Sequence, residues 1–145
     1  MAWIAASVAV ALLLVATVLI ARTAVRGRLA TAAAVARASL DDAQIALIDD
    51  RANAFGIESG GPFQMRGSGT LALTPTELVF VMAVPRREAR IPRGSILEAD
   101  ETRSHLGKTI GRPLLRVRFT NEAGDPDSAA WAVRDLSMWL GALDR

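Results

Sequence analysis

The sequence of 145 residues contains no cysteine, no tyrosine and a single histidine. The absence of cysteine excludes disulfide bonds, thiolate metal sites and a cysteine nucleophile. The lone His105 argues against a metal site built from imidazoles and against a Ser-His-Asp triad, although a triad needs only one histidine. Because the net charge is only +2 and no long basic run exists, the chain is not expected to bind nucleic acid.

The apolar residues of the chain are concentrated near its N-terminus. Residues 2–21 form twenty consecutive positions without a charged side chain. At about 1.5 Å of rise per residue, a helix of this length covers the roughly 30 Å of a bilayer's hydrocarbon core. A domain this small cannot enclose a helix that is apolar on all faces. We therefore predict a transmembrane helix over residues 1–22 rather than a buried core helix.

The residues on either side of this segment indicate an uncleaved anchor. A cleaved signal peptide would need basic residues before the apolar run and small residues directly after it. Residues 1–3 carry no basic side chain, and Arg22 follows the run. Arginines lie on its C-terminal side, at positions 22, 26, 28 and 37. The positive-inside rule then predicts a single-pass protein of the inner cell membrane, with its N-terminus outside and its C-terminal domain in the cytoplasm.

A helical linker is predicted over residues 23–56. Within it, Ser39 and Asp42 have the spacing of a capping box, which favours an amphipathic helix over residues 40–54. Its solvent face would hold Asp49 and Asp50, and its apolar residues recur at helical spacing: Ile45, Ile48, Ala52 and Phe55. Such a helix is either a dimerising coiled-coil stalk or a connector packed on the domain. The connector is favoured, because the heptad pattern is not sustained.

The hydrophobic period changes from helical to strand-like after the glycines and Pro62 that end the linker. Strands are predicted over residues 69–73, 77–83, 87–92, 96–102, 113–120 and 129–133. The run 77–83 is almost continuously apolar, which predicts a strand covered on both faces. Asp135 can cap a final helix whose apolar residues are Leu136, Trp139, Leu140 and Leu143. The expected fold class is α+β, mainly β: residues 57–145 form an antiparallel, partly open β-barrel of about six or seven strands, with Trp139 and Leu140 of the helix plugging its core.

A resemblance to a known family rests on the order of these segments and on three short stretches. Residues 69–74 lead to the apolar residues 78–80, residues 90–92 step to Ile96, and Trp131 precedes the closing helix with Asp135 and Trp139. Over residues 61–143 the chain resembles the pleckstrin-homology-like (PH-like) superfamily, in particular GRAM-type or bacterial PH-like domains. The resemblance implies a scaffold that binds lipids, peptides or proteins, usually without catalysis. Inositol-lipid binding is not implied, because the first hairpin offers only Arg66.

The most suggestive stretch for ligand contact is the loop of residues 103–112. Its charges and glycines suit an anion, because cationic side chains attract phosphate and glycines let backbone N–H groups approach. A Walker A loop is rejected, since Thr102 stands where the motif needs glycine and Pro113 interrupts any following helix. A solvated hairpin loop is the favoured alternative. The candidate anion or partner contacts are Arg103, Ser104, His105, Lys108 and Arg112.

A second basic cluster contains Arg86, Arg87, Arg90 and Arg93. It is interpreted either as a solvated strand edge, whose charges discourage pairing with other chains, or as a surface lying near an anionic leaflet. Asp100 and Glu101 are expected on opposite faces of a strand, where they cannot act together as acid and base. No catalytic, cofactor-binding or metal-binding set is found in the sequence.

These observations predict a non-enzymatic binding or scaffold module that is tied to the membrane and recognises a protein partner or the inner leaflet. No cofactor is expected. The alternative is a structural accessory subunit of a larger membrane complex, because alanines such as Ala9 and Ala16 let helices approach closely. The sequence indicates neither the identity of a partner nor the oligomeric state.

Overall fold

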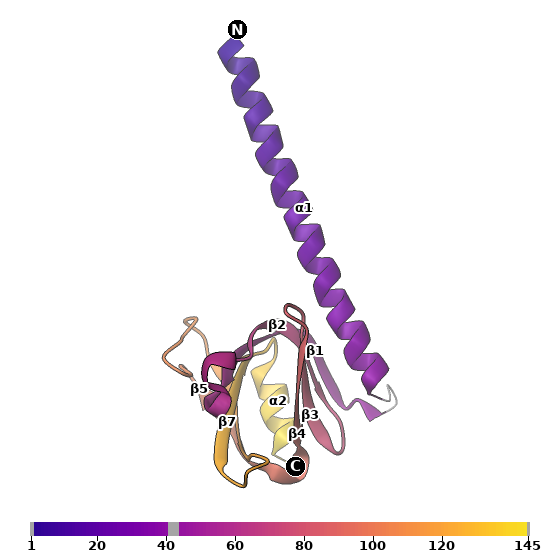
Figure 1. Cartoon of the computed structure of the whole chain (residues 1–145), viewed down its shortest axis with the longest axis vertical. Helices are drawn as coiled ribbons and strands as arrows, with labels where there is room; N and C mark the ends of the chain where they lie inside the picture. The colour runs from indigo at the N-terminus through magenta and orange to yellow at the C-terminus, as the bar shows by residue number, and fades with distance from the viewer. Residues whose placement is uncertain (1, 41–43, 145) are drawn as a thin grey trace.

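The computed structural model describes residues 2–40 and 44–144. A long helix, α1 (Ala2–Ser39), leads from the N-terminus to a domain built from one strongly curved β-sheet, and a short helix, α2 (Leu136–Leu143), lies inside the curve (Figure 1). The strands are β1 (Leu47–Ile57), β2 (Arg66–Leu73), β3 (Glu77–Met82), β4 (Arg87–Pro92), β5 (Ile96–Thr102), β6 (Leu114–Thr120) and β7 (Pro126–Ala132). Short 3-10 helices, η2 (Glu58–Phe63) and η3 (Arg93–Ser95), follow β1 and β4.

All seven strands belong to one antiparallel sheet in the order β4-β3-β2-β1-β7-β6-β5. The first and last strands of the chain are therefore neighbours at its centre, and β4 and β5 are its edges. This confirms the mainly-β α+β class. The bounds predicted for residues 87–92 and 96–102 are those of β4 and β5.

The inner face of the sheet holds the main hydrophobic core, and α2 closes it. Asp135 caps this helix as predicted, because its carboxylate accepts a hydrogen bond from Met138 N at 3.0 Å. That bond and a second one from the Ser137 hydroxyl lower the pKa of Asp135. The helix then places Trp139 in the core, with 2% of its surface exposed, together with Phe80 and Trp131. The expected plug is confirmed.

The outer face of β2 and β3 is covered by the C-terminal part of α1. Val79 and Val81 of β3 point outward and pack with Ala32 and Ala36, while the alternate residues of β3 belong to the inner core. Both faces of this strand are therefore buried, as its apolar run predicted. The small alanine side chains let the helix lie close to the sheet.

The prediction of a helix over residues 40–54 is wrong, because β1 begins at Leu47 and extends to Ile57. Asp42 of the expected capping box lies outside the described residues. The register of β1 shifts between Asp49 and Ala52 against β2, and between Ala54 and Gly56 against β7. Such bulges insert extra residues, so the buried positions of the strand lose their period of two and imitate helical spacing. The domain consequently starts before residue 57, and the helix of the linker ends at Ser39.

Asp49 was expected to face water, and the structure instead buries it to 2% exposure. Its carboxylate accepts hydrogen bonds from Arg51 N at 2.9 Å, Arg134 N at 2.7 Å and Arg134 Nε at 3.0 Å. A buried carboxylate is tolerated where hydrogen bonds and an opposite charge replace water. Asp49 therefore joins the start of β1 to the residues that follow β7.

The large apolar side chains of α1 between Val8 and Ile20 are exposed. Leu13 is 71% exposed and Ile20 is 68% exposed. The stretch Ser7–Ala38 has a mean hydropathy of 2.4 in its most apolar window, so α1 is long and apolar enough to cross a membrane. At about 1.5 Å per residue its 38 residues extend roughly 57 Å, which exceeds a hydrocarbon core. The helix continues without interruption from the apolar run onto the sheet.

Candidate functional site

The loop of residues 103–112 connects β5 to β6 and contains a small hairpin. His105 and Lys108 pair across it, with His105 N to Lys108 O at 2.9 Å and Lys108 N to His105 O at 3.0 Å. Leu106 and Gly107 form its turn with φ of 50° and 73°. Two successive positive φ values are typical of tight β-hairpin turns. Leu106 has a positive φ, a backbone conformation that is usually occupied by glycine.

His105 faces inward, unlike the other predicted contact residues of this loop. It is 7% exposed, and its Nε2 lies 3.1 Å from Gly56 O. Because a carbonyl oxygen only accepts, Nε2 carries the proton in this hydrogen bond. Burial lowers the pKa of His105, although the bond to Gly56 opposes that change. His105 thus holds the loop against the end of β1 and is not placed to contact a ligand at the surface.

We expect the His105 contact to weaken in acid. In the unfolded chain the imidazole titrates near 6.5, whereas burial lowers its pKa in the folded protein. Below about pH 6.5 the unfolded state therefore binds more protons than the folded state. As the pH is lowered, the free energy of unfolding falls until the pH has passed the pKa of His105 in the folded protein. Above pH 6.5 His105 is neutral in both states. Urea unfolding at several pH values measures this effect. The variant His105→Gln keeps an N–H donor but does not titrate, so its urea midpoint should fall less in acid than that of the unaltered protein. Urea midpoints that fall in parallel for both proteins would contradict the prediction.

Arg103, Ser104, Lys108 and Arg112 are exposed, as expected for contact residues. Ser104 also uses its carbonyl oxygen to accept a bond from Thr102 Oγ1 at 2.9 Å. Residues 103–112 contain no acidic side chain, so their three exposed cations have no carboxylate within the loop. This loop is therefore a basic surface feature.

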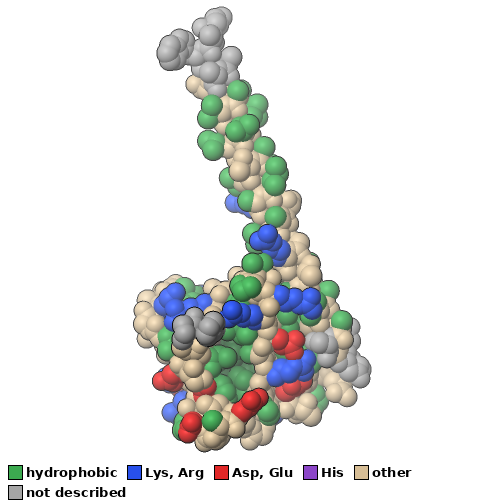
Figure 2. All heavy atoms as spheres, in the orientation of Figure 1, with side chains coloured by type: hydrophobic (Ala, Val, Ile, Leu, Met, Phe, Trp, Pro, Cys, Tyr) green, Lys and Arg blue, Asp and Glu red, His purple; other side chains and the backbone are tan. Residues whose placement is uncertain are grey.

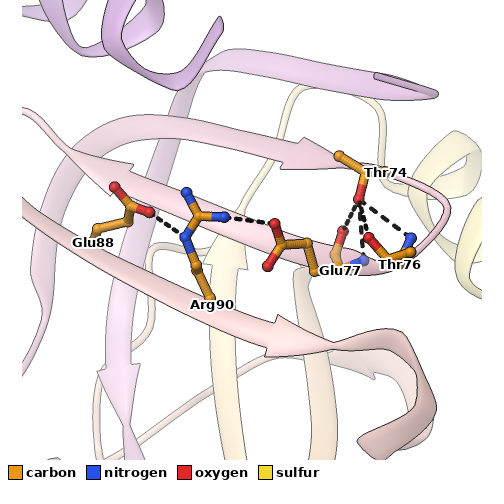
Figure 3. Close-up of polar contacts among 5 residues, drawn as sticks. All are labelled: Thr74, Thr76, Glu77, Glu88 and Arg90. Atoms are coloured by element: carbon orange, nitrogen blue, oxygen red, sulfur yellow. Dashed lines mark hydrogen bonds and ion pairs between the residues drawn. The ribbon is translucent and has the colours of Figure 1, made fainter. Parts of the chain in front are cut away.

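The predicted second basic cluster separates into two parts. Arg90 pairs with Glu88, and its Nη1 lies 2.5 Å from Glu77 Oε1 across the β3–β4 pair (Figure 3). Arg93 Nη2 donates to Ala142 O of α2 at 3.0 Å. Arg90 therefore links β4 to β3, and Arg93 links η3 to α2. Arg86 lies instead in the turn between β3 and β4, Arg87 is the first residue of β4, and both are exposed.

The β3–β4 turn lies against α1. Val25, Arg28 and Leu29 of the helix border a hollow of about 220 Å³ with Ser68, Ala83 and Val84. Arg28 and Arg86 line a neighbouring hollow of about 120 Å³. The turn is therefore the part of the domain that meets α1 nearest to its apolar run.

Contacts between neighbouring strands place the β3–β4 turn and the β5–β6 loop along one edge of the domain. A Cβ at Gly67 would lie 3.8 Å from Val84 O, and Arg66 Nε donates to Phe55 O at 3.2 Å. Gly56 follows Phe55 in β1 and accepts the hydrogen bond from His105 Nε2. Figure 2 shows Lys and Arg side chains across this edge, where α1 emerges, while the visible Asp and Glu side chains lie below them together with further Lys and Arg side chains. We call this set the basic rim: Arg66, Arg86, Arg87, Arg103, Lys108 and Arg112.

The sequence interpretation missed a groove of about 580 Å³ beside the edge strand β4. Ile57, Met65, Ile91 and Phe119 contribute apolar surface to it, and Asn121 lies at its margin. Its walls come from separate strands, so no local sequence pattern could have revealed it. None of the predicted contact residues lines this groove.

A second feature missed by the sequence interpretation is the role of Asp127, which is 5% exposed. Its carboxylate accepts bonds from Ser59 N at 3.1 Å, from the Ser59 hydroxyl and from Ser128 N at 2.8 Å. Asp127 therefore fastens η2 to β7. Asp100 pairs with Arg116, whose Nε donates to Asp100 Oδ1 at 2.8 Å, whereas Glu101 is exposed.

No group of three or more His, Asp or Glu side chains suited to a metal ion occurs in the part of the chain that the structure describes. Comparison with protein families finds no family model that matches the chain. A comparison with functionally described proteins likewise finds no match. A solved structure of the C-terminal domain of an unknown protein from Leishmania infantum is similar, with 18% identity, a TM-score of 0.47, and coverage of 76% of this chain and 92% of that one.

Proposed function

We propose that the protein is a membrane-tethered, non-enzymatic binding module with a PH-like domain on the cytoplasmic face of the inner cell membrane. The observation that carries the proposal is the continuity of α1. The same helix exposes an apolar run and then packs Ala32 and Ala36 on the sheet. The domain is thereby held directly beside the bilayer, where it recognises a protein partner or the inner leaflet.

The orientation follows from the charges on α1. Arg22, Arg26 and Arg28 follow its apolar run closely. Positive residues are retained on the cytoplasmic side of a spanning helix, so the C-terminal domain lies in the cytoplasm. The sheet order and the helix that plugs the core support the PH-like scaffold, which in that family serves binding rather than catalysis.

Extraction of cell membranes with alkaline carbonate tests the tether. The full chain should stay with the membrane, because about 20 apolar residues anchor it by the hydrophobic effect. Leu13→Asp with Leu14→Asp should release it, since each central acidic residue costs about 2.5–3.5 kcal/mol of insertion free energy. Ala38→Asp, at an exposed position near the end of α1, is the matched control and should stay bound. Release of the unaltered chain would contradict the tether.

An accessory subunit of a larger membrane complex is the second candidate. Ala9 and Ala16 are exposed on the apolar part of α1, and small side chains permit close contact with partner helices. Purification in mild detergent separates the two candidates. Stoichiometric recovery with an integral membrane assembly favours the accessory role, whereas a lone monomer favours the independent module.

A further inference from the structure

The distance between the apolar run of α1 and the β3–β4 turn of the basic rim is short. The uncharged run ends at Ala21, and the β3–β4 turn already borders α1 at Val25 and Arg28. These residues lie about 6 Å and 10 Å further along the helix axis. The headgroup layer on each side of a bilayer is about 5–8 Å thick. If the run spans the hydrocarbon core, Val25 lies within the headgroup layer and Arg28 just beyond it, so the turn beside them lies at the membrane surface.

The charge of the basic rim suits that position. The turn and the loop, residues 84–87 and 103–112, contain five arginine or lysine residues and no acidic residue. The β6–β7 turn, residues 121–125, has the opposite character, with Glu122 and Asp125 and no basic residue. Figure 1 shows this turn at the lower end of the domain, away from the N-terminal part of α1. These turns at the two ends of the domain thus carry charges of opposite sign.

Exposed apolar side chains accompany the cations of the rim. Val84 is 51% exposed at the tip of the β3–β4 turn, and Leu106 and Ile110 of the β5–β6 loop are 37% and 45% exposed. Apolar side chains next to Lys and Arg are typical of surfaces that enter a membrane interface. An acidic protein surface would satisfy the cations but would leave no role for the apolar tips next to a bilayer.

We propose that the basic rim rests on the anionic leaflet of the bilayer that α1 crosses, with Val84, Leu106 and Ile110 entering the headgroup layer. This inference rests on the proposed membrane tether. It assigns the leaflet itself as a binding partner and fixes the face that the domain presents to it. The opposite end, with the β6–β7 turn, then points toward the cytoplasm.

Single-cysteine labelling tests the proposal in the full chain, because the protein has no native cysteine. An environment-sensitive fluorophore is attached to Val84→Cys, Ile110→Cys or, as the matched control, Ala123→Cys in the β6–β7 turn. The chain is reconstituted into vesicles of phosphatidylcholine alone or of phosphatidylcholine with an equal amount of phosphatidylglycerol. We expect the labels at positions 84 and 110 to shift to lipid-like emission in the anionic vesicles and the label at 123 to stay water-like.

Charge variants test the role of the cations separately. Each Lys or Arg near an anionic surface contributes a factor of about five, so combined Arg103→Ala, Lys108→Ala and Arg112→Ala should lower the lipid-to-water ratio of the position-110 label about a hundredfold. Arg118→Ala is the control, because Arg118 lies beside the β6–β7 turn and pairs with Glu98. High salt should reproduce the loss, since it shortens the screening length to about 3 Å at 1 M.

The outcomes distinguish this inference from the tether. Carbonate release of the chain would overturn both. Retention of the chain with water-like labels at positions 84 and 110 in both vesicles would overturn only the rim contact and would favour an acidic protein as the partner of the rim. Equal insertion into phosphatidylcholine alone would overturn the dependence on anionic lipid.

Discussion

Ala36→Glu is expected to detach α1 from the sheet. Ala36 is 0% exposed and lies in the cluster that joins α1 to Val79 and Val81. A carboxylate buried there without a partner costs about 3–5 kcal/mol, which exceeds what the few small contacts of this face can offset. Since this contact orients the domain on α1, its loss would let the domain reorient relative to the helix.

Cysteine accessibility measures the detachment. Val79→Cys places a thiol beneath α1, where residue 79 is 0% exposed, and Leu71→Cys places one in the inner core. With Ala36→Glu, the thiol at 79 should react with maleimide while the thiol at 71 stays protected. The control Ala34→Glu introduces the same charge at an exposed position of the same helix and should leave both thiols protected. A protected thiol at position 79 with Ala36→Glu would refute the expectation.

Trp139→Ala is expected to destabilise the domain by about 3–5 kcal/mol. Trp139 is 2% exposed and is the buried residue that α2 contributes to the main core. Removing it leaves a cavity in the core cluster that also contains Phe80 and Trp131. Because small domains are stable by only about 5–15 kcal/mol, this loss is a large share of the total.

Thermal unfolding followed by circular dichroism measures the change, at about 4–8 °C per kcal/mol for a domain of this size. Met138→Ala is the control, because Met138 is 54% exposed on the same helix and its truncation should cost less than about 0.5 kcal/mol. Trp139→Phe keeps an aromatic ring and should fall between the two, so the prediction stays measurable if Trp139→Ala does not fold. Equal midpoints for Trp139→Ala and Met138→Ala would contradict the assigned role of Trp139.

Local patterns were sufficient for most of the sheet. The alternation of Leu115, Val117 and Phe119 predicted β6, and the continuous apolar run predicted the double burial of β3. These patterns are reliable because successive side chains of a strand point to opposite faces. The buried face of a strand can therefore be recognised from residues that are close together in the sequence. β1 was misassigned because its two bulges break that period.

The candidate site was predicted in part. Composition alone marked residues 103–112 and the arginines near residue 86 as basic segments. It did not reveal that His105 turns inward to Gly56, or that Arg90 and Arg93 are engaged by Glu77 and Ala142. Nor did it show that the two remaining segments share one edge. Those facts depend on which strands become neighbours.

The sequence by itself determined the long apolar helix, most strands, the Asp135 cap and the basic character of two segments, because each depends on residues close together in the chain. The tertiary structure decided the rest. It pairs Asp49 with Arg134 across 85 positions and His105 with Gly56 across 49. It also lays the end of α1 on β2 and β3 and so brings the β3–β4 turn of the basic rim close to the apolar run. The physical reason is that these contacts form only when the closing of the sheet brings distant segments together, and no local period encodes which segments will meet.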